Sequence, residues 1–292
     1  MANPVKLQNR LSSDVAEGNV ATSVMQASSV KHAARIRSCR GRGAGSWLQA
    51  IPSAPKFVLK FSEFRVAAFL RLGIPLPYSQ IVTKCDCSRS FDEHGYHLLT
   101  CKFGGGPVWQ HNTIVSTRAK CLDGVNIPHQ VELRNRYTDS DNRLDITTYD
   151  PTGHLTKDLD ISLTHPHSCD TVQSAAKISG YAAELREKCK MTKYGQQQSI
   201  AGSDTTCIPL VVEHFGFWGP MTEDYLDKIS KISKDANGKN SETADFRDRW
   251  RKQLSVVVQS CNSRVIFGKL SKLSKCNFDD FLYDKYVQHF VH

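Results

Sequence analysis

The 292-residue sequence lacks any apolar run close to the roughly 20 residues that span a bilayer. Its first residues, MANPVKLQNRLSSD, have no apolar core of the kind that a secretory signal carries. It also contains no internal repeat. We therefore expect neither an integral membrane protein nor one exported by a signal peptide. In such a chain the 10 cysteines should be thiols, metal ligands or core residues rather than a disulfide framework.

Acidic residues are too few to balance the basic ones. The chain has 38 Lys and Arg residues against 29 Asp and Glu residues, which gives a net charge of +9. Charged residues make up 23% and hydrophobic residues 40% of the sequence, so it is not plainly disordered. The positive excess favours a polyanionic partner, with nucleic acid first and an acidic membrane surface second.

Residues 1–46 contain few large apolar side chains and are rich in Ser, Ala and Gly. They include the basic run KHAARIRSCRGRG, in which closely spaced arginines can stay solvated and reach phosphates. A plain soluble linker is an equally good interpretation of this segment. The candidate nucleic-acid-binding residues are Arg35, Arg37, Arg40 and Arg42.

Periodic patterns predict a packed region from about Trp47 onward. Phe61, Phe64, Ala68 and Leu72 recur at intervals of three and four, which predicts an amphipathic helix that stops at Gly73. Pro107 is a suitable first residue for a helix of about 15 residues.

Three strand-like runs follow, at 127–134, 142–150 and 155–165, and the turn DPTG makes the last two a hairpin. We then expect one helix of about 20 residues within 169–194, a buried central strand over 208–212, and further helices.

Three cysteines and a histidine are grouped in KCDCSRSFDEHGYHLLTC, with the spacing C-x-C-x9-H-x3-C. Two cysteines one residue apart fit one tight turn, and a His and a Cys four apart face the same way on a helical turn. Three thiolates and one imidazole complete a closed tetrahedral shell, which is typical of structural zinc. The alternative is three buried cysteines beside a surface histidine, and His94 is a rival histidine. The predicted ligands are Cys85, Cys87, His97 and Cys101.

The hairpin places two acids where they can meet. Asp145 lies between Leu144 and Ile146 and should face away from both, whereas Asp160 alternates with apolar residues on the next strand. Adjacent carboxylates repel each other unless a cation lies between them, and oxygen ligands suit magnesium or manganese. Ordinary solvent-facing acids are the alternative. The following helix brings lysines close by, at Lys188, Lys190 and Lys193, next to Tyr194.

Together these residues resemble the C-terminal zinc-knuckle and PD-(D/E)xK restriction-like endonuclease region of non-LTR retrotransposon polyproteins. The matching strings cover roughly residues 43–219: GAGSWLQAIP, FSEFRVAAFLRLGIP, CDC…HGYHLLTCKFGGG…QHN, NRLDI, DLDISLTHP, SAAKISGYAAE, KMTKY and VVEHFGFWG. The knuckle followed by GGG and HN, and then by the pair of acidic strings, is a specific combination.

The resemblance implies that Asp145 and Asp160 bind the catalytic metal. Ser162 stands where the usual lysine would be, which resembles nucleases whose lysine has moved to a following K-x-x-K-Y string. Here that string supplies Lys190, Lys193 and Tyr194, and it does not choose between the lysines. Lys177 is a third candidate lysine, Glu132 a further carboxylate, and His111 lies where related nucleases often keep an acid. Leu144 replaces the signature proline, and the reverse transcriptase domain of such polyproteins is missing.

The expected fold is α/β, with a restriction-endonuclease-like mixed central sheet flanked by helices and preceded by a small zinc-knuckle module. We divide the chain into a basic flexible arm (1–46), a helix plus knuckle (47–106), an endonuclease core (107–220) and a C-terminal helical extension (221–292). The expected activity is metal-dependent DNA nicking, with structural zinc and catalytic magnesium or manganese. An inactive zinc-dependent nucleic-acid-binding remnant is the alternative. The expected partner is DNA, with RNA as a second candidate, and we expect no membrane association. We expect the protein to be located inside the cell, in the nucleus. The sequence does not predict an oligomeric state.

Overall fold

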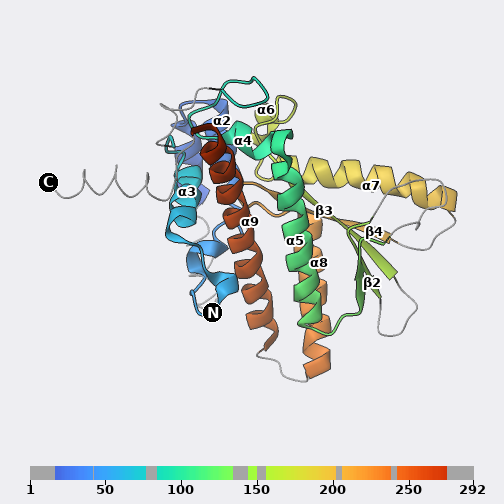
Figure 1. The fold of residues 1–292 in the computed structure, drawn as a ribbon. Coiled ribbons are helices and arrows are strands. Elements are labelled where there is room, and N and C mark those ends of the chain that lie inside the picture. The colour runs from blue at the N-terminus through green and yellow to red at the C-terminus, as the bar shows by residue number, and fades with distance from the viewer. Residues whose placement is uncertain are drawn as a thin grey trace, which may run out of the picture.

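The computed structural model describes residues 17–41, 43–76, 84–133, 144–149, 156–201, 206–237 and 242–274. It is a mixed α/β structure in which a four-stranded mixed sheet is flanked by helices (Figure 1). In the described ranges, no helix combines the length and the apolar character that crossing a bilayer requires.

Four strands form the sheet, in the spatial order of their sequence: β1 (His129–Val131), β2 (Ile146–Tyr149), β3 (Thr156–Thr164) and β4 (Thr206–Glu213). The predicted hairpin is confirmed, because β2 and β3 pair antiparallel with Ile146 opposite Leu159. β4 pairs with β3 in parallel. The prediction of a central strand there is wrong, since β4 lies at the edge of the sheet. Its Leu210 and Val211 are nevertheless fully buried, because helices pack against both faces of the strand.

The two faces of the sheet have different surroundings (Figure 1). On one face, Leu159 and Ile161 join the main hydrophobic core. Much of the rest of this core comes from three long helices, α5 (Gly106–Asp123), α8 (Pro220–Asn237) and α9 (Glu242–Ser274), and the neighbouring strands add Ile146, Leu210 and Val212. The other face carries Asp158, Asp160 and Ser162, all buried, and α7 (Tyr181–Ala201) packs against it. The alternation of polar and apolar residues along β3 therefore separates two covered faces rather than a buried and a solvated one.

The helix predicted within 169–194 is interrupted. The structure instead has a short α6 (Val172–Ala175) and a separate α7, with a turn between them at Gly180. Gly180 has a φ of +76°, and a Cβ there would lie 2.0 Å from Phe217 Cε1. The turn thus requires both a left-handed backbone and the absence of a side chain. Ala182 and Ala183 are buried, so their small side chains let α7 approach the sheet closely.

The N-terminal segment differs from the expected flexible arm. Residues 17–25 are helical, and α2 (Val30–Ser38) begins with the Ser29 side chain accepting a hydrogen bond from the backbone. Arg35 is only 4% exposed and donates to the Arg71 carbonyl. The alanine-rich composition of this segment was interpreted as that of a linker, but Ala33 and Ala34 are buried on the face of α2 that packs inward, and α2 contacts α6.

Helix α3 (Phe61–Leu72) ends at Gly73, whose φ of +69° matches the predicted stop. The predicted apolar stripe is wrong, however, because Phe61 and Leu72 are 72% and 62% exposed. The buried side chains are Glu63, Val66, Ala67 and Leu70. Apolar periodicity did not predict this face, because one of its buried positions is occupied by the charged residue Glu63. It is held inside by the Arg264 guanidinium on α9, 2.7 Å away, and by Ser260.

Helix α9 packs both against the sheet region and against the region of α3 and the cysteines, whereas the sequence predicted a C-terminal extension. Trp250, Leu254 and Val258 pack in the core under the sheet, while Ile266 and Leu270 pack with α3 and the cysteine region. A short helix α4 (Tyr96–Thr100) belongs to that region. Three single 3-10 turns complete the described elements: η1 (Ser46–Gln49), η2 (Pro55–Phe57) and η3 (Phe103–Gly105).

Candidate functional site

The four predicted zinc ligands come together at α4, with two cysteines on the turn before it, the histidine within it and the third cysteine directly after it. One ligand atom from each of Cys85, Cys87, His97 and Cys101 lies within 4.8 Å of every other. The Sγ atoms of Cys85 and Cys101 are 3.8 Å apart, and Cys87 Sγ lies 3.1 Å from His97 Nε2. Two thiolates about 2.3 Å from one tetrahedral ion would be separated by about 3.8 Å, so the spacing fits zinc. This cluster could therefore hold a metal ion such as zinc.

The backbone around the cluster explains this convergence. Residues 84 and 90 form a bridge that closes a tight turn, in which Ser88 has a φ of +67°. Asp92 accepts hydrogen bonds from the amides of Tyr96 and His97 and so fixes the start of α4. The rival His94 is directed elsewhere, because its Nε2 lies 3.1 Å from the Gly73 carbonyl.

Protonation in the cluster follows local contacts. A hydrogen bond from the Arg89 backbone lowers the pKa of the Cys87 thiol, whereas burial raises the pKa of Cys85. Burial also lowers the pKa of His97, which favours the neutral imidazole that a metal ligand must be.

The second group of predicted residues surrounds Asp160 on β3. Lys190 Nζ lies 2.9 Å from Asp160 Oδ1 and 2.7 Å from Oδ2. The Tyr194 hydroxyl donates to the same Oδ1 at 2.6 Å. Burial raises the pKa of Tyr194, so its hydroxyl keeps the proton that it donates. Lys190 and Tyr194 are four residues apart on α7, so both lie on the same side of this helix and both reach Asp160.

Asp145 lies just before β2, at a bend that changes the direction of the chain. The prediction that it faces away from both neighbours needs correction at Leu144. Leu144 packs with Tyr194 on the α7 face, whereas Ile146 packs in the main core on the other face. Between them, the Asp145 carboxylate accepts a hydrogen bond from the Ile161 amide at 2.6 Å.

His111 on α5 is the other partner of Asp145, with its Nε2 3.0 Å from Oδ1. This hydrogen bond is the main reason that the pKa of His111 is raised, and the charges of Asp160 and Lys190 also act on it. His111 therefore belongs to the same group of charges as the two aspartates and the lysine.

The remaining predicted residues lie differently. Lys193 is exposed, with its Nζ 5.1 Å from the Tyr194 ring centre, and Lys177 is exposed in the turn after α6. Glu132 has a φ of +58°, and its amide donates to the Asp145 carbonyl. Of the predicted arginines, Arg37 donates to the Ala176 carbonyl at 2.7 Å. Arg40 pairs with Glu17, in the helical segment before α2, at 2.6 Å, and Arg42 lies outside the described residues.

Sequence reasoning missed Arg186. Its Nε donates to the Ser162 hydroxyl at 3.1 Å, so α7 presents a guanidinium to the position on β3 two residues after Asp160. The signal was available as a four-residue interval, because Arg186, Lys190 and Tyr194 repeat along one side of α7.

Within the part of the chain that the structure describes, Asp145 and Asp160 do not join a third His, Cys, Asp or Glu in a metal-ligand group like that of the cysteines. The chain matches no family model, and a comparison with curated proteins finds no relative.

Proposed function

We propose that this chain is a divalent-metal-dependent DNA endonuclease that hydrolyses phosphodiester bonds. We further propose that it is of the restriction-like type that accompanies a zinc knuckle in non-LTR retrotransposon polyproteins. The observation that carries the proposal is the contact of Lys190 and Tyr194 with Asp160, beside Asp145. The resemblance assigns these four residues to one site, to which α7, β3 and the bend before β2 contribute.

The positions of the two aspartates support a shared site. Ile146 pairs with Leu159, so one step along each strand brings Asp145 level with Asp160. Asp145 bonds to the amide of Ile161, the residue next to Asp160. The Asp145 carboxylate is therefore anchored to β3 at the residue that follows Asp160.

The donor set suits a hard divalent cation. Asp160 Oδ2 is buried, and among the described residues its contact is the Lys190 ammonium at 2.7 Å. Because each carboxylate oxygen has two lone pairs, Asp145 and Asp160 retain acceptor capacity beyond their present contacts. Carboxylate oxygens are preferred ligands of magnesium and manganese. A cation bound there would supply Lewis-acid activation of a water molecule and of the phosphate.

The chain's own residues would then have separate tasks. Tyr194 fixes the rotamer of Asp160 through its buried hydroxyl. Lys190 neutralises that carboxylate and can offer an N–H group to a phosphate oxygen. His111 orients Asp145 through its imidazole. Arg186 adds a positive charge beside Ser162, which lies two residues after Asp160 on the same face of β3.

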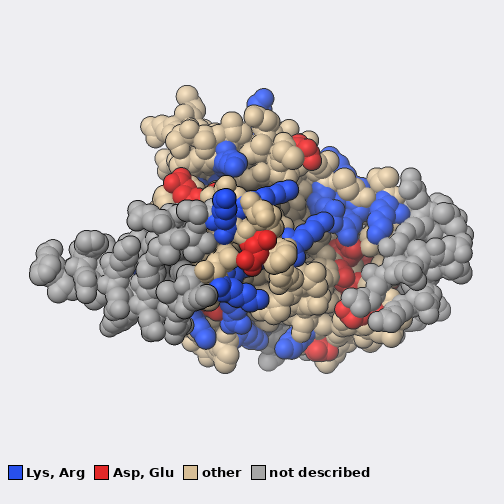
Figure 2. All heavy atoms as spheres, turned by 45° about the horizontal axis from the view of Figure 1, so that its top comes forward, with Lys and Arg blue, Asp and Glu red and all other residues tan. Residues whose placement is uncertain are grey.

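Charge on the surface favours a polyanionic substrate. Figure 2 shows a face on which Lys and Arg side chains gather in several groups while Asp and Glu side chains are fewer. The net charge of +9 has the same sign. Phosphate contacts of this kind give affinity without sequence readout.

The test is nicking of supercoiled plasmid by the zinc-loaded full chain, with magnesium or manganese added. The wild type should produce open circles, and Asp160→Asn should lower the rate about 100-fold or more. Binding of a labelled duplex should stay nearly unchanged in that variant. The matched control is Asp170→Asn, because Asp170 is exposed in the loop after β3.

Two outcomes contradict the proposal. If the wild type binds DNA but never nicks it with either metal, the chain is the inactive zinc-dependent nucleic-acid-binding protein of the alternative. If Asp160→Asn nicks as fast as wild type, the activity does not come from this site.

A further inference from the structure

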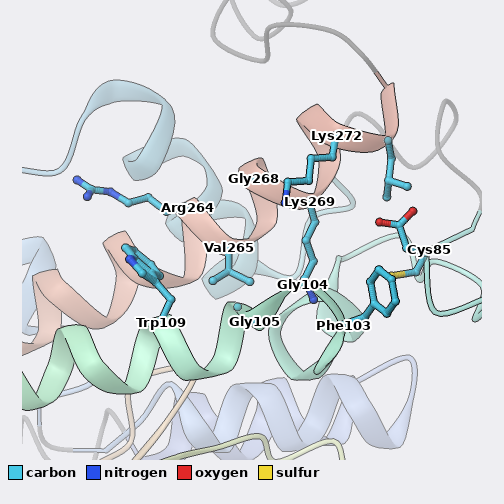
Figure 3. Close-up of a pocket in the computed structure, with 13 residues that line it drawn as sticks. Cys85, Phe103, Gly104, Gly105, Trp109, Arg264, Val265, Gly268, Lys269 and Lys272 are labelled. Atoms are coloured by element: carbon cyan, nitrogen blue, oxygen red, sulfur yellow. The ribbon is translucent and has the colours of Figure 1, made fainter.

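A cavity separate from the aspartate group lies between the cysteine cluster and α9. It has a volume of about 220 Å³, and the start of α5 and the last turns of α9 line it. Figure 3 shows Trp109 on α5 and Phe103 in the preceding turn along its edge, with Lys269 and Lys272 projecting from α9. Cys85 forms part of the wall, so the cysteine cluster borders the cavity.

Two aromatic rings at this cavity are exposed to solvent. Trp109 is 42% and Phe103 56% exposed. The other three tryptophans, Trp47, Trp218 and Trp250, are at most 4% exposed. Exposed rings beside basic side chains are typical of surfaces on which unpaired bases stack.

The cavity also offers donors for a phosphate. Lys269 Nζ donates to the Leu98 and Cys101 carbonyls at 3.1 and 2.8 Å, and an ammonium group has a third N–H beyond these two. Lys272 is exposed at the next turn of α9. Arg264 also lines the cavity, but its guanidinium pairs with Glu63. Asp86 is the acidic residue among the lining side chains, so positive charge predominates.

The start of α5 adds backbone donors. Its N-cap residue Gly105 makes no side-chain capping bond, and its first turn contains no acidic residue. The amides of a first helical turn lack partners within the helix and attract anions. A Cβ added at Gly104, Gly105 or Gly268 would meet nothing within 4 Å, so a ligand can approach the backbone closely.

We propose that this cavity binds single-stranded DNA, with a base stacked on Trp109 or Phe103. The adjoining phosphate lies against Lys269, Lys272 and the first turn of α5. Single-stranded rather than duplex DNA fits, because stacking between neighbouring base pairs of a duplex hides the base faces that these rings would contact. The choice of DNA as the occupant rests on the proposed endonuclease function.

The experiment titrates the zinc-loaded full chain with a short oligothymidine and follows tryptophan fluorescence together with the anisotropy of a labelled strand. Quenching is expected, because Trp109 is the solvent-exposed tryptophan. Trp109→Ala should abolish the quenching and weaken binding about tenfold in anisotropy. Lys272→Gln should lower the slope of log affinity against log salt by about 0.7.

A cavity-filling variant gives an independent check. Gly268→Leu adds a side chain into the cavity from a helical position and should weaken binding about tenfold. Gly18→Leu is the matched control, because Gly18 is also helical and a Cβ there also meets nothing within 4 Å. Circular dichroism of each variant checks that it is folded before its binding is compared.

The inference is overturned if duplex of the same length binds as tightly as the single strand, if oligouridine binds and oligothymidine does not, or if Gly268→Leu binds as well as Gly18→Leu. Quenching without any plasmid nicking would support this site and contradict the proposed nuclease. Nicking without quenching would do the reverse.

Discussion

Removal of the Lys190 charge should destabilise the protein strongly. Asp160 is 4% exposed, and Lys190 Nζ lies within 2.9 Å of both carboxylate oxygens. Lys190→Met keeps most of the aliphatic stem but leaves a buried carboxylate with one neutral donor, Tyr194. Loss of one partner from a buried ion pair costs about 3–5 kcal/mol. The Lys190 side chain is 15% exposed, so water relieves part of this cost and we expect about 3 kcal/mol.

Urea unfolding of the zinc-loaded chain measures this change as a difference in the free energy of unfolding. Lys188→Met is the control, because its ammonium lies two residues away on the same helix and is exposed. Asp160→Asn combined with Lys190→Met should recover part of the lost stability, since the buried charge is then gone. If Lys190→Met costs no more than Lys188→Met, the buried pair does not exist in solution.

The remaining predictions concern the metal, a turn and a buried acid. Metal analysis should find one zinc per chain, and Cys101→Ser should lose it and lower the melting temperature. An alanine in the left-handed backbone region costs about 1–2 kcal/mol. In urea unfolding, Gly180→Ala should lower the free energy of unfolding by more than this amount, because Phe217 occupies the space of the added Cβ. Gly104→Ala should lower it by only this amount, because Gly104 has a φ of +78° and a Cβ there meets nothing within 4 Å. Burial raises the pKa of Glu187 to about 7, so this group binds a proton more tightly when folded, and its contribution to stability falls as pH rises from about 4.5 to 7. Glu187→Gln should therefore raise the melting temperature more at pH about 8 than at pH about 5, and equal shifts at both would contradict the assignment.

The cysteine cluster could be predicted from sequence because its ligand spacing is local. Cys85 and Cys87 share one turn, and His97 and Cys101 share one helical turn, so few long-range contacts are needed. The strand pairing was predictable for a similar reason, because the alternation along β3 fixes which residues share a face.

The contacts that depend on helix packing could not be predicted. The sequence offered two lysines in the K-x-x-K-Y string, and only the seating of α7 through Ala182 and Ala183 turns Lys190 toward Asp160. The break at Gly180 depends on Phe217, 37 residues away, which occupies the space where a side chain would be. 

Buried charges misled the prediction at the N-terminal end. Arg35 was interpreted as solvated because arginine seldom lies inside, yet it donates to the carbonyl at the end of α3. Glu63 shifted the apparent apolar stripe of α3 in the same way, since its partner Arg264 lies 201 residues later. Long-range partners of this kind leave no local periodicity.

The most direct test of the proposed metal site is manganese binding to the zinc-loaded chain, followed by the loss of the electron paramagnetic resonance signal of the free ion. Wild type and Asp170→Asn should each bind one manganese ion per chain in addition to zinc, while Asp145→Asn and Asp160→Asn should bind it at least about tenfold more weakly. Equal manganese affinity in wild type and Asp160→Asn would contradict a shared cation between the two aspartates.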